Sequence, residues 1–181
     1  GGGGHRNEAP PLLADCLVLS RTGNLEKSSA FQRGLFYIQD PASRLAAAAL
    51  APEPGMRVLD CCAAPGGKSF AAAIAMENRG EVVSCDLHPH KKKLIQAGAD
   101  RLGLTCVTPM TADGRVFRPE WEGAFDRVLV DAPCSGLGVI RKKPDIREKD
   151  PEALTRLPQV QRAILDTAAR YVKPGGVLVY S

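Results

Sequence analysis

A turn that carries an acid, a rigid proline and a thiol stands in the second half of the chain, where an apolar run ends. The run Phe125–Val130 predicts a buried strand, and it is followed by Asp131-Ala132-Pro133-Cys134-Ser135-Gly136. Doubly wound parallel sheets bind ligands and react at the carboxyl ends of their strands. An acid and a soft nucleophile at such an edge are the residue types of acid–base and covalent catalysis. We therefore expect Asp131 and Cys134 to be catalytic residues.

A glycine-rich turn lies upstream, between a predicted strand over 57–62 and a predicted helix over 68–77. Its sequence is Cys62-Ala63-Ala64-Pro65-Gly66-Gly67-Lys68. A phosphate-binding P-loop needs glycine at the position that Cys62 occupies, which disfavours an ATPase. The spaced glycine triplet of dinucleotide-binding turns is missing as well. The turn instead suits close approach of the backbone to a ligand without a pyrophosphate.

Three acidic residues stand at the ends of successive predicted strands. Asp86 follows the glycine-rich turn by about 20 residues, where a carboxylate can accept hydrogen bonds from both hydroxyls of a ribose. Asp113 ends the next strand and could accept from the exocyclic amine of adenine, and Asp131 ends the one after. Together with the turn, these acids predict an adenosine-bearing cofactor without phosphates, S-adenosylmethionine.

Strand-like and helix-like segments alternate from Met56 onward, which is typical of a mostly parallel sheet with helices on both faces. The expected fold is therefore Rossmann-like. The sequence predicts strands at 57–62, 81–85, 106–110, 125–130 and 177–180, and helices at 68–77, 90–102 and 151–171, the last interrupted near Pro158.

Three regions are expected along the chain. Residues 1–10 form a disordered tail, and residues 11–51 form a small preamble with a hairpin and a helix that begins at Asp40-Pro41. Residues 52–181 form the cofactor-binding catalytic domain. Because the chain ends on an apolar strand, we expect a fragment truncated after its fifth strand, with an exposed sheet edge at 177–180 that favours self-association.

The charge pattern indicates a polyanionic partner. The net charge is only +4, but the segment 141–149 holds five positive and two negative residues directly after the Cys134 turn. A basic segment beside an active site is typical of a protein that binds nucleic acid. We expect Arg141, Lys142 and Lys143 to contact an RNA backbone.

Other site classes are disfavoured. The six cysteines form no C-x-x-C pair, which argues against a zinc site and leaves Cys61, Cys85 and Cys106 as small hydrophobic residues on strands. No apolar run approaches the roughly 18 residues of a membrane span. We expect a cytoplasmic protein without a metal or a membrane partner.

The two turns and the segment Arg141-Lys142-Lys143-Pro144-Asp145-Ile146 resemble the RNA (cytosine-5)-methyltransferase family over roughly residues 30–181, and 36–43 is similar to the lead-in to its cofactor domain. The resemblance implies methyl transfer from S-adenosylmethionine to C5 of a cytosine, with 16S ribosomal RNA as the expected substrate and a monomer for the full-length protein. Asp131 would lie between cofactor and base. The implied cofactor-binding residues are Cys62, Ala63, Ala64, Pro65, Gly66, Gly67, Lys68, Asp86, Asp113 and Asp131.

The resemblance also assigns the thiols. The family's attacking cysteine is implied to stand in a Thr-Cys step just after 177–181, and Cys134 would assist release of the methylated product. We therefore expect this fragment to be inactive by itself. Two other interpretations stay open at this point: a non-catalytic fragment that binds RNA and cofactor, and a nicotinamide-dependent oxidoreductase, for which Pro65 makes a pyrophosphate contact awkward.

Overall fold

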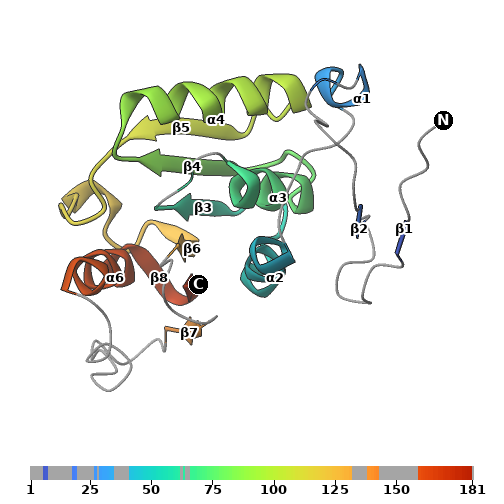
Figure 1. The fold of residues 1–181 in the computed structure, drawn as a ribbon. Helices are drawn as coiled ribbons and strands as arrows, with labels where there is room; N and C mark the ends of the chain where they lie inside the picture. Colours follow the sequence, from blue (N-terminus) through green and yellow to red (C-terminus); the bar gives the residue numbers. More distant parts are fainter. Residues whose placement is uncertain are drawn as a thin grey trace.

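A six-stranded sheet forms the centre of the computed structural model of this chain (Figure 1). The structure describes residues 6–7, 18–19, 27, 29–34, 41–61, 63, 66–131, 138–142 and 159–180. The strand order is β5-β4-β3-β6-β8-β7, in which all neighbours are parallel except β7 and β8. The strands are β3 (Arg57–Asp60), β4 (Glu81–Asp86), β5 (Val107–Thr111), β6 (Phe125–Val130), β7 (Gly138–Arg141) and β8 (Val172–Tyr180).

Two apolar clusters lie on the two faces of the sheet, because successive residues of a strand point to opposite sides. Val58 and Val82 face the cluster with helices α2 (Pro41–Leu50), α3 (Gly67–Ala75) and α4 (Pro89–Leu102). Leu59 and Val83 face the cluster with α6 (Gln159–Tyr171) and the short helix η3 (Pro119–Trp121). Burial on both faces explains why the strands read as near-continuous apolar runs. The Rossmann-like fold expected from the sequence is confirmed.

Element boundaries agree with the sequence within one or two residues for most of this region. Strand β6 has the expected bounds, and α4 ends at Gly103, whose left-handed φ of 70° closes the helix. Helix α6 is described from Gln159 to Tyr171, and the first part of the expected helix, residues 151–158, lies outside the described residues.

Strand β8 is longer than expected. Its pairing with β6 jumps from Phe125–Val172 to Arg127–Val177, so residues 173–176 bulge out of the ladder opposite one residue of β6. The sequence Lys173-Pro174-Gly175-Gly176, which predicts a turn between α6 and the last strand, is therefore a bulge within that strand. Lys142 fastens the bulge through its backbone: its N–H donates to Gly176 O at 3.0 Å and its O accepts from Gly175 N at 2.8 Å.

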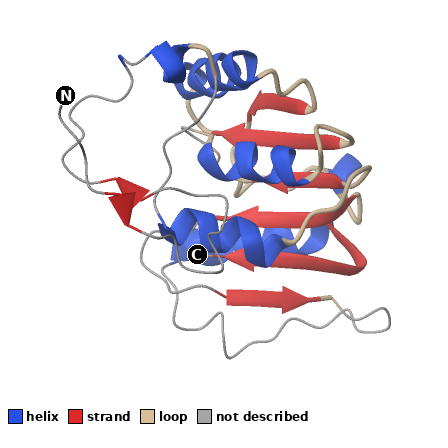
Figure 2. Ribbon diagram, turned by 90° about the vertical axis from the view of Figure 1, so that its right-hand side faces the viewer, coloured by secondary structure: helices blue, strands red, loops and turns tan. Residues whose placement is uncertain are grey.

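The expectation of an exposed apolar edge at 177–180 is wrong. Strand β7 covers that edge with antiparallel pairs from Gly138–Tyr180 to Arg141–Val177, and Figure 2 shows it running opposite to the other strands of the sheet. The alternation of strands and helices predicts only parallel neighbours, so it misses a strand that folds back from the turn after β6. The argument for self-association loses its basis.

The first part of the chain also differs from expectation. Arg6–Asn7 (β1), expected in a disordered tail, pairs antiparallel with Val18–Leu19 (β2). The segment 35–38, the other expected hairpin strand, lies outside the described residues. Helix α1 (Ser29–Gln32) rests on α4, because Arg101 stacks 3.8 Å from the ring centroid of Phe31 and donates to its carbonyl at 2.7 Å. The three-region division stays a prediction. In the described part of the chain, every helix is too short or too polar to cross a membrane.

Candidate functional site

The carboxyl ends of four neighbouring strands present a row of acidic side chains. Across the sheet in the order β5-β4-β3-β6, these are Asp113, Asp86, Asp60 and Asp131. With about 4.8 Å between neighbouring strands, the row spans about 14 Å. The chain runs from β3 outward to β4 and β5 and then returns to place β6 on the other side of β3. This reversal makes a topological switch point between β3 and β6, where such sheets bind ligands.

The glycine-rich turn after β3 is shaped by Gly66. Gly66 directly precedes the first residue of α3 and has a φ of 112° and a ψ of 0°. A Cβ at this position would lie 2.5 Å from the ring of Phe70. Only glycine meets both conditions. Ala63 donates its N–H to Cys85 O at 2.8 Å, which fastens the start of the turn to β4. Of the other residues expected to wrap the cofactor, Gly67 and Lys68 open α3, whereas Cys62, Ala64 and Pro65 lie outside the described residues.

A buried hydrogen-bond chain holds the start of α3 against the sheet. Ser84 Oγ donates to Ser69 Oγ at 2.7 Å, and Ser69 Oγ donates to Asp60 Oδ2 at 2.7 Å. All three residues are at most 1% exposed. Because hydrogen bonds to a buried carboxylate are strong, this chain links β4, α3 and β3 directly beneath the turn.

Sequence reasoning missed this chain, although a signal for part of it was present. Asp60 ends a buried strand in the same way as Asp86 and Asp131, so the strand-end rule that singled out those two also applies to Asp60. The roles of Ser69 and Ser84 follow only from the packing of α3 on the sheet.

An ion pair spans the switch point. Lys68 Nζ lies 3.0 Å from Asp131 Oδ2, and the two side chains are 11% and 41% exposed. Sequence reasoning placed Lys68 in the cofactor turn and Asp131 in the catalytic turn, and the structure joins them. A sheltered ammonium group beside an accessible carboxylate is an arrangement that can hold or pass a proton.

Asp86 is held at the end of β4 in a defined orientation. Its Oδ1 accepts a hydrogen bond from His88 N at 3.1 Å, and the residue is 8% exposed. The next residue, Leu87, is 51% exposed although it is large and apolar. A fixed carboxylate beside an exposed apolar side chain suits a ligand that has hydroxyl groups next to a flat ring.

Asp113 lies further along the edge and is paired with Arg115. Its Oδ1 accepts from Arg115 N at 2.9 Å and from Nε at 3.0 Å, and its Oδ2 lies 2.8 Å from the second guanidinium nitrogen. These hydrogen bonds keep the pKa of Asp113 below its usual value. Asp113 is thus a fixed, ionised acceptor, although Arg115 takes up part of its capacity.

The remaining expected site residues are Cys134 in the catalytic turn and the basic residues that follow it. Cys134 and Lys143 lie outside the described residues, and Arg141 ends strand β7. Lys142 donates from Nζ to Val172 O at 2.6 Å, and burial lowers its pKa. The structure therefore engages Lys142 in holding β8, whereas the sequence predicts that it contacts RNA.

Several proteins that are similar to this chain are named methyltransferases. A family model described as 16S rRNA methyltransferase RsmB/F matches residues 47–181. The chain is 50% identical over 171 residues to a Bacillus subtilis protein named probable ribosomal RNA small subunit methyltransferase B, covering 93% of this chain and 38% of that protein. It is 42% identical over 151 residues to the ribosomal RNA small subunit methyltransferase F of Serratia proteamaculans, covering 82% and 32%. The chain thus spans less than two fifths of these relatives.

Solved structures agree with these sequence matches. NSun6 from Pyrococcus horikoshii, solved with SFG, has 30% identity and a TM-score of 0.67 over 87% of this chain and 40% of its own. A methyltransferase homolog protein from Pyrococcus horikoshii has 28% identity and a TM-score of 0.73 over 98% of this chain and 56% of its own. The family resemblance is confirmed, and the nicotinamide-dependent oxidoreductase is left without support.

Proposed function

Because the chain belongs to the RsmB/F family of 16S rRNA methyltransferases, we propose that it carries the catalytic part of an enzyme that methylates C5 of a cytosine in 16S ribosomal RNA, with S-adenosylmethionine as the methyl donor. The observation that carries this proposal is the acidic row at the carboxyl edge, which ends at the Lys68–Asp131 pair. Residues 52–181 would form the catalytic domain and 11–51 the preamble that precedes it. We propose further that the protein acts in the cytoplasm, where its ribosomal RNA substrate is found, and that the whole protein is a monomer.

The row of side chains fits the cofactor in its order and chemistry. Asp113 would accept from the adenine amine, and Asp86 would accept from the ribose hydroxyls beside the exposed Leu87. The turn that contains Gly66 would receive the methionine part, because no side chain caps the start of α3 at Gly66. When bound, S-adenosylmethionine supplies an electrophilic methyl group. With the adenine at Asp113 and the ribose at Asp86, the methyl group would lie toward the switch point between β3 and β6.

The chemistry of the base explains why Asp131 stands at that point. C5 of cytosine is a poor nucleophile until a thiolate adds at C6, which pushes an electron pair through the ring toward C5 and the ring nitrogen. A group that stabilises the charge on the ring lowers the barrier. Asp131 would bond the ring and relay a proton to it from the adjacent Lys68 ammonium as charge develops there. After methyl transfer, a base removes the C5 proton and the thiol leaves.

Two thiols would share the covalent steps, following the family resemblance. Cys134 would assist the elimination that releases methylated RNA, and a second cysteine of the whole protein would attack C6. The basic residues Arg141 and Lys143 would contact phosphates of the RNA backbone beside the catalytic turn. Lys142 would contribute less to RNA binding, since its ammonium group already donates to Val172 O.

Digestion of the reaction product to nucleosides tests this proposal. The whole protein that contains this chain is incubated with methyl-labelled S-adenosylmethionine and unmodified 16S ribosomal RNA, and the nucleosides are separated by mass. We expect the label in 5-methylcytidine and its loss in the Asp131→Ala variant. Label on another atom or another nucleoside would overturn the C5 assignment, and no transfer by the folded protein would overturn the function itself.

A further inference from the structure

Three sulfur-bearing side chains lie side by side on neighbouring strands, next to the acidic row. Cys85 on β4 is in register with Met110 on β5. Asp60 on β3 is in register with Ser84, so Cys61 and Cys85, one residue further along, stand opposite each other. All three side chains pack in the same apolar cluster, on the face covered by α6. A single face of three strands therefore carries two thiols and a thioether in a row.

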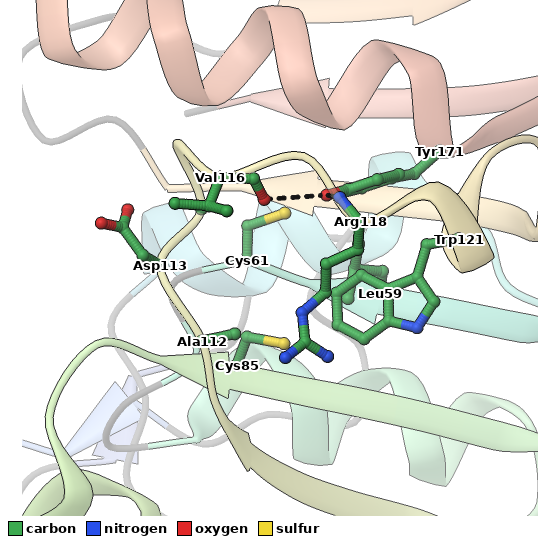
Figure 3. Close-up of a pocket in the computed structure, with 10 residues that line it drawn as sticks. Leu59, Cys61, Cys85, Ala112, Asp113, Val116, Arg118, Trp121 and Tyr171 are labelled. Atoms are coloured by element: carbon green, nitrogen blue, oxygen red, sulfur yellow. Dashed lines mark hydrogen bonds between the residues drawn. The ribbon is translucent and has the colours of Figure 1, made fainter.

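The two thiols line a small recess, which is also bordered by Arg118, Trp121 and Tyr171. Figure 3 shows both sulfur atoms pointing to the same side of the sheet, into this recess. Burial raises the pKa of the Tyr171 phenol, and the nearby thiols of Cys61 and Cys85 raise it further. The Tyr171 side chain therefore lines the same recess as the two thiols.

A positive charge lies at the other end of the row. The Arg118 guanidinium donates to Met110 Sδ at 3.6 Å and stacks 4.8 Å from the ring centroid of Trp121. It also lies 3.8 Å from Glu120 Oε1, at the outer side of the recess. The guanidinium can therefore offset negative charge that develops on the sulfur atoms.

The register of the two thiols suits a bridging ion. Neighbouring strands lie about 4.8 Å apart, and the two cysteines stand opposite each other on the same face. Neither cysteine is in a disulfide. A metal ion held between two thiolates, with bonds of about 2.3 Å as for zinc and sulfur, allows the sulfur atoms to lie up to about 4.6 Å apart.

The ligand set selects the class of ion. Thiolate and thioether sulfur are soft ligands and favour Cu(I). Zinc favours four ligands, and the described part of the chain holds no group of three or more histidine, cysteine or acidic side chains that could hold a metal ion. We propose that Cys61 and Cys85, with Met110 as a third ligand, form a binding site for a soft monovalent cation of the Cu(I) type.

Binding at this site needs no oxidant. Each thiol loses its proton to solvent, two copper–thiolate bonds and one copper–thioether bond form, and the copper stays monovalent throughout. The Arg118 guanidinium lies beside the two thiolates and the cation and offsets part of their net negative charge, which limits the penalty for burying the ion. This inference does not rest on the proposed function, because metal binding is measured without cofactor or RNA.

An anaerobic titration with Cu(I) against a chromogenic Cu(I) chelator tests the site. The variant in which Cys16, Cys62, Cys106 and Cys134 are replaced by serine keeps only Cys61 and Cys85, and we expect it to bind one ion per chain. Adding Cys85→Ser should weaken binding by more than about 100-fold, since changes one shell further out already weaken metal binding 10- to 100-fold. Met110→Leu should have a smaller effect.

A matched control and a ligand-sensitive measurement complete the test. Cys106 is also buried but packs in the cluster on the opposite face, so Cys106→Ser in the natural chain should leave the tight site intact. X-ray absorption at the copper edge of the loaded natural chain should show only sulfur neighbours at about 2.3 Å. The proposal would be overturned if the copper had nitrogen or oxygen neighbours, or if Cys85→Ser bound copper with equal affinity. It would also be overturned if Cys61 and Cys85 formed a disulfide, with loss of two hydrogens, and took up no copper.

Discussion

The two turns that flank the switch point are held in opposite ways. The turn after β3 rests on a buried chain of hydrogen bonds from Ser84 through Ser69 to Asp60, all at most 1% exposed. The turn after β6 begins with Asp131, which is 41% exposed and is paired with Lys68 across the gap. One turn is thus fastened from below, and the other presents its acid to solvent.

The difference in burial indicates that Asp60 stabilises the fold and that Asp131 takes part in the reaction. A buried carboxylate bonded by hydroxyl groups stabilises the fold, and solvent or substrate cannot reach it. An exposed carboxylate adds little stability, but it can bond a substrate and exchange a proton. The same residue type at the end of two neighbouring strands therefore has two roles, which substitutions should separate.

The largest effect is expected from Asp131→Ala in the whole protein. Methyl transfer should fall about 100- to 1000-fold, the range seen when one group that stabilises transition-state charge is removed. The free energy of unfolding should change by less than about 1 kcal/mol, because the ion pair is partly exposed. Single-turnover rates and urea unfolding measure the two quantities.

Asp126→Ala is the matched control, since Asp126 lies on the same strand and its carboxylate accepts from Arg57 N at 2.8 Å, away from the carboxyl edge. It should lower stability and leave the rate per folded molecule unchanged. If Asp131→Ala transferred methyl groups as fast as the natural protein, Asp131 would have no role in the reaction and the two turns would not differ in function.

The opposite pattern is expected for Asp60→Ala. Loss of the buried acceptor leaves the Ser69 hydroxyl without its carboxylate partner and should lower the free energy of unfolding by about 2–3 kcal/mol. Ser84→Ala, at the far end of the chain, should have a smaller effect, about 1 kcal/mol. Urea unfolding of both variants tests whether Asp60→Ala loses more stability than Ser84→Ala. Equal stability of Asp60→Ala and the natural protein would show that these buried hydrogen bonds do not stabilise the fold.

Gly66→Ala probes the shape of the fastened turn. The left-handed backbone costs a non-glycine residue about 1–2 kcal/mol, and the added Cβ would also lie 2.5 Å from the Phe70 ring. Gly103→Ala isolates the first contribution, because Gly103 has a φ of 70° and no atom within 4 Å of its Cβ position. Thermal unfolding should therefore show a larger loss for Gly66→Ala, and equal losses would mean that Phe70 moves aside without penalty.

The smallest effect is expected from Lys142→Ala. Loss of the hydrogen bond to Val172 O should lower the free energy of unfolding by about 1 kcal/mol. The salt dependence of RNA binding should stay nearly the same, whereas Arg141→Ala should lower the log–log slope by about 0.7–0.9, as for one phosphate contact. If Lys142→Ala changed the slope as much as Arg141→Ala, Lys142 would also contact a phosphate of the RNA.

Much of the fold follows from the sequence because the parallel strands are apolar on both faces and their turns carry clear signals. Strand β6 and the end of α4 at Gly103 are examples. Strand β7 could not be predicted in this way, because its identity depends on pairing with β8, which is distant in sequence. The bulge in β8 could not be predicted either, because its Pro-Gly-Gly sequence fits a turn equally well.

The candidate site shows the same division. Strand-end position was enough to single out Asp86, Asp113 and Asp131. The pairing of Lys68 with Asp131 and the support of Ser69 by Ser84 depend on which strands become neighbours, and chain order alone does not fix that. The engagement of Lys142 with Val172 likewise follows from tertiary packing.

Calorimetric titration of the chain with S-adenosylmethionine tests the central claim most directly, since the acidic row is proposed to bind this cofactor. Asp86→Ala should weaken binding by about 1.5–3 kcal/mol, the loss expected for hydrogen bonds to a charged group, or about 10- to 150-fold in affinity. Glu81→Gln, a change at the opposite end of the same strand, is the matched control and should leave affinity unchanged. Equal affinity of Asp86→Ala and the natural chain would contradict the account.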